Sequence, residues 1–506
     1  MTTRHLKPAH PVALTATFVL ALAVTAAGVA AMRGLETGDP GQQAAAAATV
    51  RADVFSVRPY LQAADTPEGL SVLWQTGDAP GDDGPWSVEV RRTPEGPWVE
   101  TAGPTRRRLV IDGVPPSRIH RATLTGLEPG GGFSYRVKKA GVAAFEAPAT
   151  ARPAPGRPHR FVVFGDCAAA TVAEKAVAFQ AFQAKPGYVV VTGDVVYSRG
   201  RVSEYLDHFF PVYNADAPSP DAGAPLIRST LFVAAPGNHD LIEGDLDKYP
   251  DGLAYFYYWD QPRNGPVAEA GAKGAPLLKG SPGRQRAFLD AAGPAYPRTA
   301  NFSFEAGDVH WTVLDSNTYT DWTAAPLRAW LDADLASPAA KKAAWRVVAF
   351  HHATFHSGKA HADDQRMRLV APSLEAGRVD LVFNGHVHNY QRTYPLKFAP
   401  GPPPADGRGK PYGPNGQVAG AWALDLAFDG VKTTRPVGVI YVVTGAGGAK
   451  LYDPALGDDP ASWQPYTAKV VSNVHSLTVV DVTPTALTVR QVADDGREVD
   501  RFNVTR

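Results

Sequence analysis

Five short apolar runs along the chain each stop at polar residues of a kind that bind metal ions. The runs are RFVVF (160–164), YVVV (188–191), LFVAAP (231–236), VVAF (347–350) and VDLVF (379–383). Continuous apolar runs of this length are typical of strands that are covered on both faces of a parallel sheet. In open α/β sheets, ligands bind at the carboxyl ends of the strands. We therefore expect the residues after these runs to form one site.

The residues after the runs fall into two chemical sets. They are Asp166, Asp194 with Tyr197, Asn238 with His239, His351 with His352, and His386 with His388. Carboxylates and a phenolate suit a hard trivalent ion, whereas imidazoles and an amide oxygen suit a softer divalent one. Asp194 could bridge such a pair of ions. Taken singly, the Gly165-Asp166 pair is typical of a turn, and Tyr197 could pack near a sheet end. The occurrence of all these residues in order, each at a strand end, favours a site for two metal ions.

The rest of the chain divides by its hydrophobic pattern. Residues 52–150 alternate apolar and polar positions, as in WSVEVR (86–91), which predicts a small β-sandwich. A proline-rich linker (151–158) follows, and a βαβ unit begins the second domain (159–506), which includes strands from about 476 onward. The helix of that unit starts at a Thr171–Glu174 capping box. Its apolar face is predicted to hold Val172, Ala176, Phe179 and Phe182.

The N-terminus carries a targeting pattern. Basic residues precede an uncharged run that ends at Met32, so residues 1–32 are expected to be a cleaved signal peptide, with an uncleaved membrane anchor as the alternative. Residues 33–51 then form a flexible linker. Either interpretation places the remainder outside the cytoplasm, as a secreted, periplasmic or cell-surface protein. Its one cysteine, Cys167, allows no internal disulfide.

The ordered motifs resemble those of the purple acid phosphatases, within the metallophosphoesterase superfamily. The family signature GD, GDxxY, GNH with an acid, VxxH and GHxH is present from Gly165-Asp166 to Gly385-His386-Val-His388. The resemblance implies an α/β fold, a four-layer αββα sandwich. It extends to the front domain, where Leu127, Pro129 and Phe133 resemble the corner of a fibronectin type III domain, with phenylalanine in place of the usual tyrosine.

The resemblance also assigns roles. Fe(III) would be held by Asp166, Asp194, Tyr197 and His388, and a divalent ion (Fe, Zn or Mn) by Asp194, Asn238, His351 and His386. A metal-bound hydroxide would attack a phosphomonoester, with His239 donating a proton, Asp240 orienting His239, and His361 contacting phosphate. The expected activity is that of an exported acid phosphatase. A phosphodiesterase or nucleotide hydrolase on the same scaffold is the alternative, and a non-enzymatic binding protein ranks third.

Some positions depart from the family pattern or keep an open role. Ala360 replaces one histidine of a phosphate-binding pair, and Gln391 stands where glutamate is common. The roles of Cys167, His352 and His356 stay open, although Cys167 is most simply interpreted as a small buried residue. His310 is expected to be a core histidine whose ring nitrogens have hydrogen-bond partners. Acidic and basic residues balance at 50 each, so charge predicts a small phosphorylated substrate and no nucleic-acid partner. The oligomeric state is open, and membrane association depends on the N-terminal segment.

Overall fold

The structure is a computed structural model, and it describes residues 54–506 except 65–68, 80–83, 242–243, 268–272 and 407. The described residues belong to one compact unit. The predicted signal or anchor (1–32) and linker (33–51) lie outside them. Among the described residues, no helix has both the length and the apolar character needed to span a membrane.

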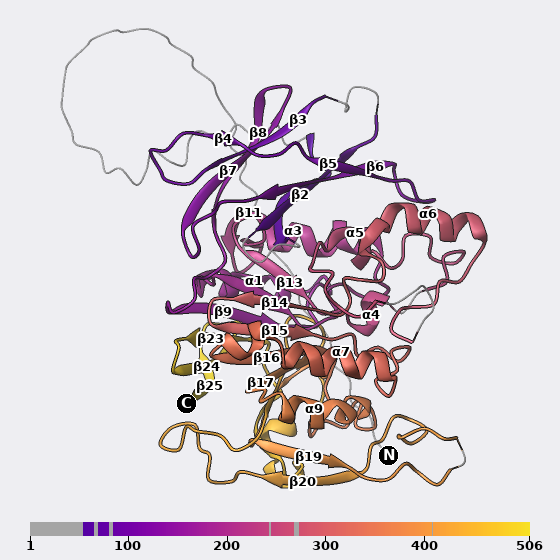
Figure 1. Cartoon of the computed structure of the whole chain (residues 1–506), viewed down its shortest axis with the longest axis vertical. Helices are drawn as coiled ribbons and strands as arrows, with labels where there is room; N and C mark the ends of the chain where they lie inside the picture. The colour runs from indigo at the N-terminus through magenta and orange to yellow at the C-terminus, as the bar shows by residue number, and fades with distance from the viewer. Residues whose placement is uncertain (1–53, 65–68, 80–83, 242–243, 268–272, 407) are drawn as a thin grey trace, which may run out of the picture. The chain divides into compact units, whose positions relative to one another are not determined.

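A ten-stranded sheet forms one half of the fold (Figure 1). Its strands in spatial order are β25 (Glu498–Thr505), β24 (Ala486–Ala493), β23 (Ser476–Val482), β9 (His159–Phe164), β10 (Tyr188–Val191), β13 (Leu231–Ala234), β1 (Val57–Ala63), β2 (Leu70–Gly77), β6 (Ser117–Leu124) and β5 (Thr105–Leu109). The apolar runs β9, β10 and β13 are parallel neighbours. Their carboxyl ends therefore lie along one edge, as the sequence predicts.

A seven-stranded sheet forms the other half. Its order is β14 (Phe302–Ala306), β15 (Val309–Val313), β16 (Trp345–His352), β17 (Leu381–Gly385), β21 (Ile440–Thr444), β18 (Tyr390–Thr393) and β22 (Thr467–Val471). Strands β15, β16, β17 and β21 are parallel. The two sheets pack through aromatic rings, with Phe161 of β9 edge-on to Trp311 at 5.2 Å and to Phe383 at 6.3 Å between ring centroids.

Helices cover the outer faces of both sheets, which gives the predicted four layers. The helices are α1 (Val172–Gln183), α2 (Val202–Glu204), α3 (Phe210–Tyr213), α4 (Asn238–Leu241), α5 (Tyr255–Tyr258), α6 (Pro282–Ala292), α7 (Ala325–Leu335), α8 (Pro338–Lys342) and α9 (Ala371–Ala376). Helix α7 shows the pattern clearly, because Leu327, Leu331 and Leu335 are spaced four residues apart and all are buried against the seven-stranded sheet. The small two-stranded sheets are β11 (Asn214–Ser219) with β12 (Gly223–Pro225), and β19 (Leu396–Pro400) with β20 (Gly420–Leu424).

The front of the chain folds as the expected β-sandwich. One sheet holds β4 (Val99–Glu100), β3 (Trp86–Arg91), β7 (Gly132–Lys139) and β8 (Val142–Thr150), and it faces β1, β2, β6 and β5. The second of these layers is continuous with the ten-stranded sheet, because β1 pairs in parallel with β13. The two parts therefore share one sheet, a connection that the alternating pattern did not reveal. The domain boundary near residue 150 stays a prediction.

The predicted rotation of helix α1 is wrong. The start is correct, since the Thr171 hydroxyl accepts a hydrogen bond from the Glu174 amide at 3.1 Å. The buried positions, however, are Glu174, Val177, Ala178 and Ala181, while Val172 is 72% exposed. Small residues let this helix lie close to its sheet, and the larger phenylalanines sit at the sides of the contact.

Candidate metal centre

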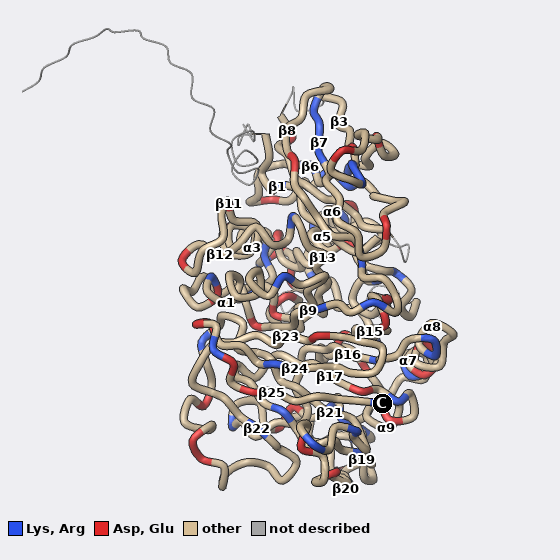
Figure 2. Tube along the Cα trace, turned by 90° about the vertical axis from the view of Figure 1, so that its left-hand side faces the viewer, with Lys and Arg blue, Asp and Glu red and all other residues tan. Residues whose placement is uncertain are grey.

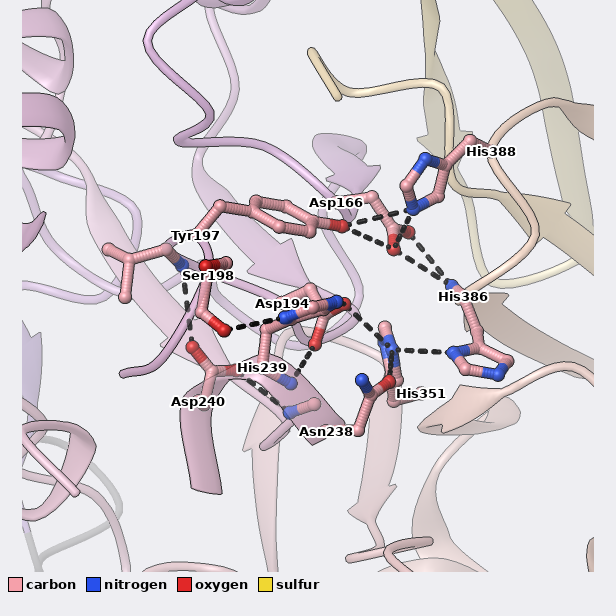
Figure 3. Close-up of polar contacts among 12 residues, drawn as sticks. Asp166, Asp194, Tyr197, Ser198, Asn238, His239, Asp240, His351, His386 and His388 are labelled. Atoms are coloured by element: carbon pink, nitrogen blue, oxygen red, sulfur yellow. Dashed lines mark hydrogen bonds and ion pairs between the residues drawn. The ribbon is translucent and has the colours of Figure 1, made fainter. Parts of the chain in front are cut away.

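Polar side chains from five strand ends converge on one site between the two sheets (Figure 3). Asp166 follows β9, Asp194 and Tyr197 follow β10, Asn238 and His239 open α4, His351 lies at the end of β16, and His386 and His388 follow β17. Asp166, Asp194 and His351 are at most 1% exposed. The structure thus brings together all seven predicted metal ligands.

The first group within the site joins Asp166, Tyr197 and His388. The Tyr197 hydroxyl lies 3.0 Å from Asp166 Oδ1 and 3.0 Å from His388 Nε2. His388 Nε2 is in turn 3.2 Å from Asp166 Oδ1. These three ligand atoms face a common point.

The second group surrounds His351 Nε2. Asn238 Oδ1 lies 3.0 Å from that nitrogen, His386 Nδ1 3.2 Å and Asp194 Oδ2 3.3 Å. Ligand atoms of Asp194, Asp166 and His388 also fall within 4.8 Å of one another. Asp194 therefore reaches both groups, which is the position required of a bridging carboxylate.

Backbone carbonyls fix the tautomers of two histidines. His351 Nδ1 lies 2.9 Å from the Thr192 carbonyl oxygen, and His388 Nδ1 lies 2.7 Å from that of Lys450. Because a carbonyl only accepts, each Nδ1 carries the proton, and in the neutral ring Nε2 presents a lone pair to the site. Metal-ligating histidines are held by this type of contact.

The converging atoms fit two neighbouring cations. Two carboxylates, a phenol, an amide oxygen and three imidazoles all offer electron pairs to the same small volume. Such a set of lone pairs would repel one another in the buried site without positive charge between them. The donor set therefore suits a pair of metal ions, with the harder oxygen ligands gathered in the first group.

The signature glycines allow the loops to approach this closely. A Cβ at Gly237 would lie 2.1 Å from the Asp194 amide nitrogen, and one at Gly193 would lie 2.7 Å from His351 Nδ1. Gly193 also has a φ of 93°, a left-handed conformation that favours glycine. Asp166 and Asp194 adopt positive φ values of 58° and 48°, so the backbone is strained where it presents the carboxylates.

The charges of the site act strongly on one another. Burial lowers the pKa of His351, but the Asp194 carboxylate more than offsets this and raises it to about 9. Burial, followed by the charge of Asp166, raises the pKa of the Tyr197 phenol well above its usual value. A metal ion bound at His351 Nε2 would compete with a proton for that nitrogen.

Comparison with known proteins identifies the domain that contains the metal-binding residues. A family model described as calcineurin-like phosphoesterase matches residues 159–390. The chain contains a metallophosphoesterase domain. Purple acid phosphatase 18 of Arabidopsis thaliana is 40% identical over 95 residues, which are 18% of this chain and 21% of that protein. The chain thus aligns with about a fifth of that relative's length.

Longer alignments have lower identity. Purple acid phosphatase 23 of Arabidopsis thaliana is 25% identical over 54% of this chain and 57% of its own length. An uncharacterized protein of Mycobacterium tuberculosis is 23% identical over 72% of this chain and 70% of its own. The fold resembles purple acid phosphatase PPD1 from yellow lupin, with a TM-score of 0.60, 17% identity and coverage of 88% of this chain and 74% of that one. These findings confirm the resemblance and the fold.

The metallophosphoesterase domain places His239 beside the metal centre. Its backbone amide donates to Asp194 Oδ1 at 2.8 Å, and its ring Nδ1 lies 2.7 Å from the Ser198 carbonyl oxygen. This contact fixes the proton on Nδ1 and leaves Nε2 free to face the centre, 4.0 Å from Asp194 Oδ2. His239 is therefore oriented by a carbonyl group.

Asp240 does not orient His239, contrary to the prediction. Its carboxylate is fully buried and accepts from the amides of Gly237 at 2.8 Å and Val195 at 3.0 Å. It therefore ties the loop after β13 to the loop after β10. Consecutive side chains in a helix such as α4 point about 100° apart, so Asp240 is directed away from the site when His239 faces it.

Several further histidines surround His386. The exposed His361 ring stacks at a tilt 3.9 Å from that of His386, at the outer side of the centre. The buried His352 ring lies 4.4 Å from His386, and its Nδ1 is 2.7 Å from the Ser316 hydroxyl. His352 Nε2 is 3.9 Å from Asp364, and these two residues with His386 form a second cluster of ligand types. His356 is buried nearby, and its Nδ1 has no partner among the described residues.

Sequence reasoning missed Tyr452 and the orienting carbonyls of Thr192 and Lys450. The Tyr452 ring stacks on His388 at 4.0 Å with planes 9° apart, which holds the imidazole in place. It lies after the glycine-rich stretch that follows β21, and no motif marks it. Cys167 is buried with its thiol 3.4 Å from the Val195 carbonyl oxygen, as a small core residue would be. Gln391 is buried too and accepts from the Ser357 amide at 2.7 Å.

Proposed function

We propose that this protein is an exported dinuclear-metal acid phosphatase that hydrolyses phosphomonoesters. The observation that carries the proposal is the pair of adjacent ligand groups that Asp194 joins, one of which includes the phenol of Tyr197. Phosphate esters are substrates that two neighbouring cations suit, because both ions can face the charged oxygens. The purple acid phosphatase relatives support the same substrate class.

The residues present would hold two different ions. Fe(III) would lie among Asp166, Asp194, Tyr197 and His388. A divalent iron, zinc or manganese ion would lie among Asp194, Asn238, His351 and His386. When bound, such a pair supplies an activated water and neutralises charge on the phosphoryl oxygens.

The chain's own groups would orient the substrate and move protons. His239, with Nδ1 held by the Ser198 carbonyl, can carry a second proton on Nε2 and donate it to a phosphate oxygen or to the leaving alcohol. This donation requires the doubly protonated ring. His361, exposed beside His386, would contact the phosphate as it enters. Asp240 acts only through the backbone that it holds.

The proposed location rests on the N-terminal sequence. The basic residues before an uncharged run at 1–32 support export, and a protein outside the cytoplasm would act on phosphate esters in its surroundings. The first test of location is the mass of the mature protein recovered from the culture medium or cell envelope. Full-length cytoplasmic protein with residues 1–32 intact would refute export.

The activity test compares two substrates on metal-loaded protein. Hydrolysis rates for an aryl phosphate monoester and the matching diester should be measured from acidic to neutral pH. We expect faster monoester hydrolysis with an optimum at acidic pH, loss of activity on chelation and its return when metal is added. A clear diester preference would contradict the proposal and support a phosphodiesterase or nucleotide hydrolase.

A further inference from the structure

A basic pocket lies at the end of the seven-stranded sheet opposite the metal centre. It has a volume of about 650 Å³ and lies between α7, α8, α9 and the start of β16. Its lining contains four basic residues, Arg328, Lys341, Arg346 and Arg378, against one acidic residue, Asp332. The chain as a whole has equal numbers of acidic and basic residues, so this local excess is a feature of the pocket. Blue segments mark the basic residues of α7 and α8 on this side of the molecule (Figure 2).

Among the basic residues that line the pocket, Arg346 is the buried one. It is only 8% exposed, and its buried Nε has no hydrogen-bond partner within the part of the chain that the structure describes. A buried Nε–H group without an acceptor costs free energy, because it loses its hydration and gains no replacement. A residue of this kind at the base of an open pocket is the feature expected of a site for an anion.

The neighbouring charges do not supply the missing acceptor. Burial lowers the pKa of Arg346, Arg506 lowers it further, Asp380 opposes this effect, and Arg378 adds to it. The Asp380 carboxylate already binds the Arg506 guanidinium at 2.6 Å and accepts from the Arg346 backbone amide at 2.9 Å. Arg506 and Arg378 therefore both act unfavourably on a charged Arg346, and the Asp380 carboxylate that opposes them is already bound to Arg506.

The remaining basic residues are placed to complete such a site. Arg328 is anchored, donating to the Leu369 carbonyl oxygen at 2.5 Å and to the Ser373 hydroxyl at 3.0 Å, so its position is fixed by α9 and the turn that precedes it. Lys341 and Arg378 are exposed and can move toward a ligand. A fixed guanidinium, a buried guanidinium and two mobile cations suit the several oxygens of a phosphate group.

We propose that this pocket is a second, non-catalytic site that binds the phosphate group of a small molecule. It is distinct from the metal centre, since His351 lies five positions beyond Arg346 along the extended strand β16, a distance of about 17 Å. Inorganic phosphate and a phosphorylated metabolite share the chemistry that the pocket recognises. The proposal does not depend on which ester the metal centre hydrolyses.

Isothermal titration of the metal-loaded full chain with inorganic phosphate tests the proposal. We expect two phosphate ions per chain, one at the metal centre and one in the pocket. Lys341→Gln and Arg378→Gln should each weaken the second site by about tenfold, because each removes one charged hydrogen bond. Lys342→Gln is the matched control, since Lys342 is the adjacent exposed lysine on α8 and does not line this pocket.

Further outcomes separate this site from general surface charge. Arg346→Met should abolish the second site and leave monoester hydrolysis unchanged. Without phosphate, its melting temperature should not fall, because methionine replaces a buried Nε–H that has no acceptor among the described residues. One phosphate ion per chain in the wild type that Arg346→Met retains would overturn the proposal. Equal effects of Lys341→Gln and Lys342→Gln would also overturn it. Titration with a phosphorylated sugar in place of inorganic phosphate distinguishes a site for free phosphate from a site for a phosphorylated metabolite. A higher affinity for the sugar phosphate indicates that the pocket also binds the sugar, and a lower affinity indicates a site for free phosphate.

Discussion

A buried histidine far from the metal centre should make the stability of this protein depend on alkaline pH. His310 in β15 is 1% exposed, with Nδ1 3.0 Å from Glu305 and Nε2 3.2 Å from Asp334. Burial lowers its pKa, but hydrogen bonds to Asp334 and Glu305 more than offset this and raise it to about 9 from 6.5. His310 is thus satisfied in the core, as the sequence predicts, and it is held as a cation between β14 and α7.

The sign and size of the effect follow from that shift. Because the folded pKa lies above the unfolded one, the stabilisation is fully present below pH 6.5 and is lost as the pH rises through 9. At 1.36 kcal/mol for each pKa unit, it amounts to at most about 3 kcal/mol. The figure is an upper one, because the Glu305 side chain is 38% exposed and its charge is partly screened by water.

The assay is urea unfolding of the wild type and His310→Gln at about pH 6 and about pH 10. The wild type should be the more stable protein at the lower pH, and the gap should shrink by up to about 3 kcal/mol at the higher pH. Thr312→Val is the control, since it removes the 2.7 Å hydrogen bond to Asp334 and leaves the imidazole in place. It should keep the wild-type pH dependence. A gap between wild type and His310→Gln that stays constant across this range would refute the reasoning.

Three further predictions concern the metal centre. Tyr197→Phe should fold normally and, after iron loading and oxidation, lack the visible absorption band of the wild type; a colourless wild type would contradict the iron assignment. His386→Ala should lose one divalent ion by metal analysis and nearly all monoester hydrolysis, and retained turnover would contradict the two-metal arrangement. Asp240→Asn should lower the free energy of unfolding by about 3 kcal/mol, since one carboxylate oxygen that accepts a backbone amide becomes a donor facing it. Unchanged urea unfolding of that variant would show that Asp240 does not hold the two loops.

The parts of the fold that could be predicted are those with a local signal. The runs at β9, β10, β13, β16 and β17 are continuous and apolar, so their burial in parallel sheets follows from composition. Their polar ends converge because parallel strands present their carboxyl ends along one edge. For the same reason, the convergence of these polar residues could be predicted without knowledge of the loops that hold them.

The parts that could not be predicted depend on contacts between distant segments. The pairing of β1 with β13 joins Gln62 to Phe232, and no local pattern specifies which edge a strand will meet. The face of α1 was misjudged because hydrophobicity favours its phenylalanines, whereas close packing favours Ala178 and Ala181. Tyr452 stacks on His388 from a loop beyond β21. Sequence periodicity predicts where side chains point in strands and helices, but it does not predict this for a loop.

The central claim is that this chain holds two metal ions side by side, and metal analysis of the purified, reconstituted protein tests it most directly. The two ligand groups that Asp194 joins predict two ions per chain in the wild type, with the loss of at least one in Asp194→Asn. A single ion per chain, or two ions that Asp194→Asn retains at full occupancy, would contradict the dinuclear centre and the mechanism built on it.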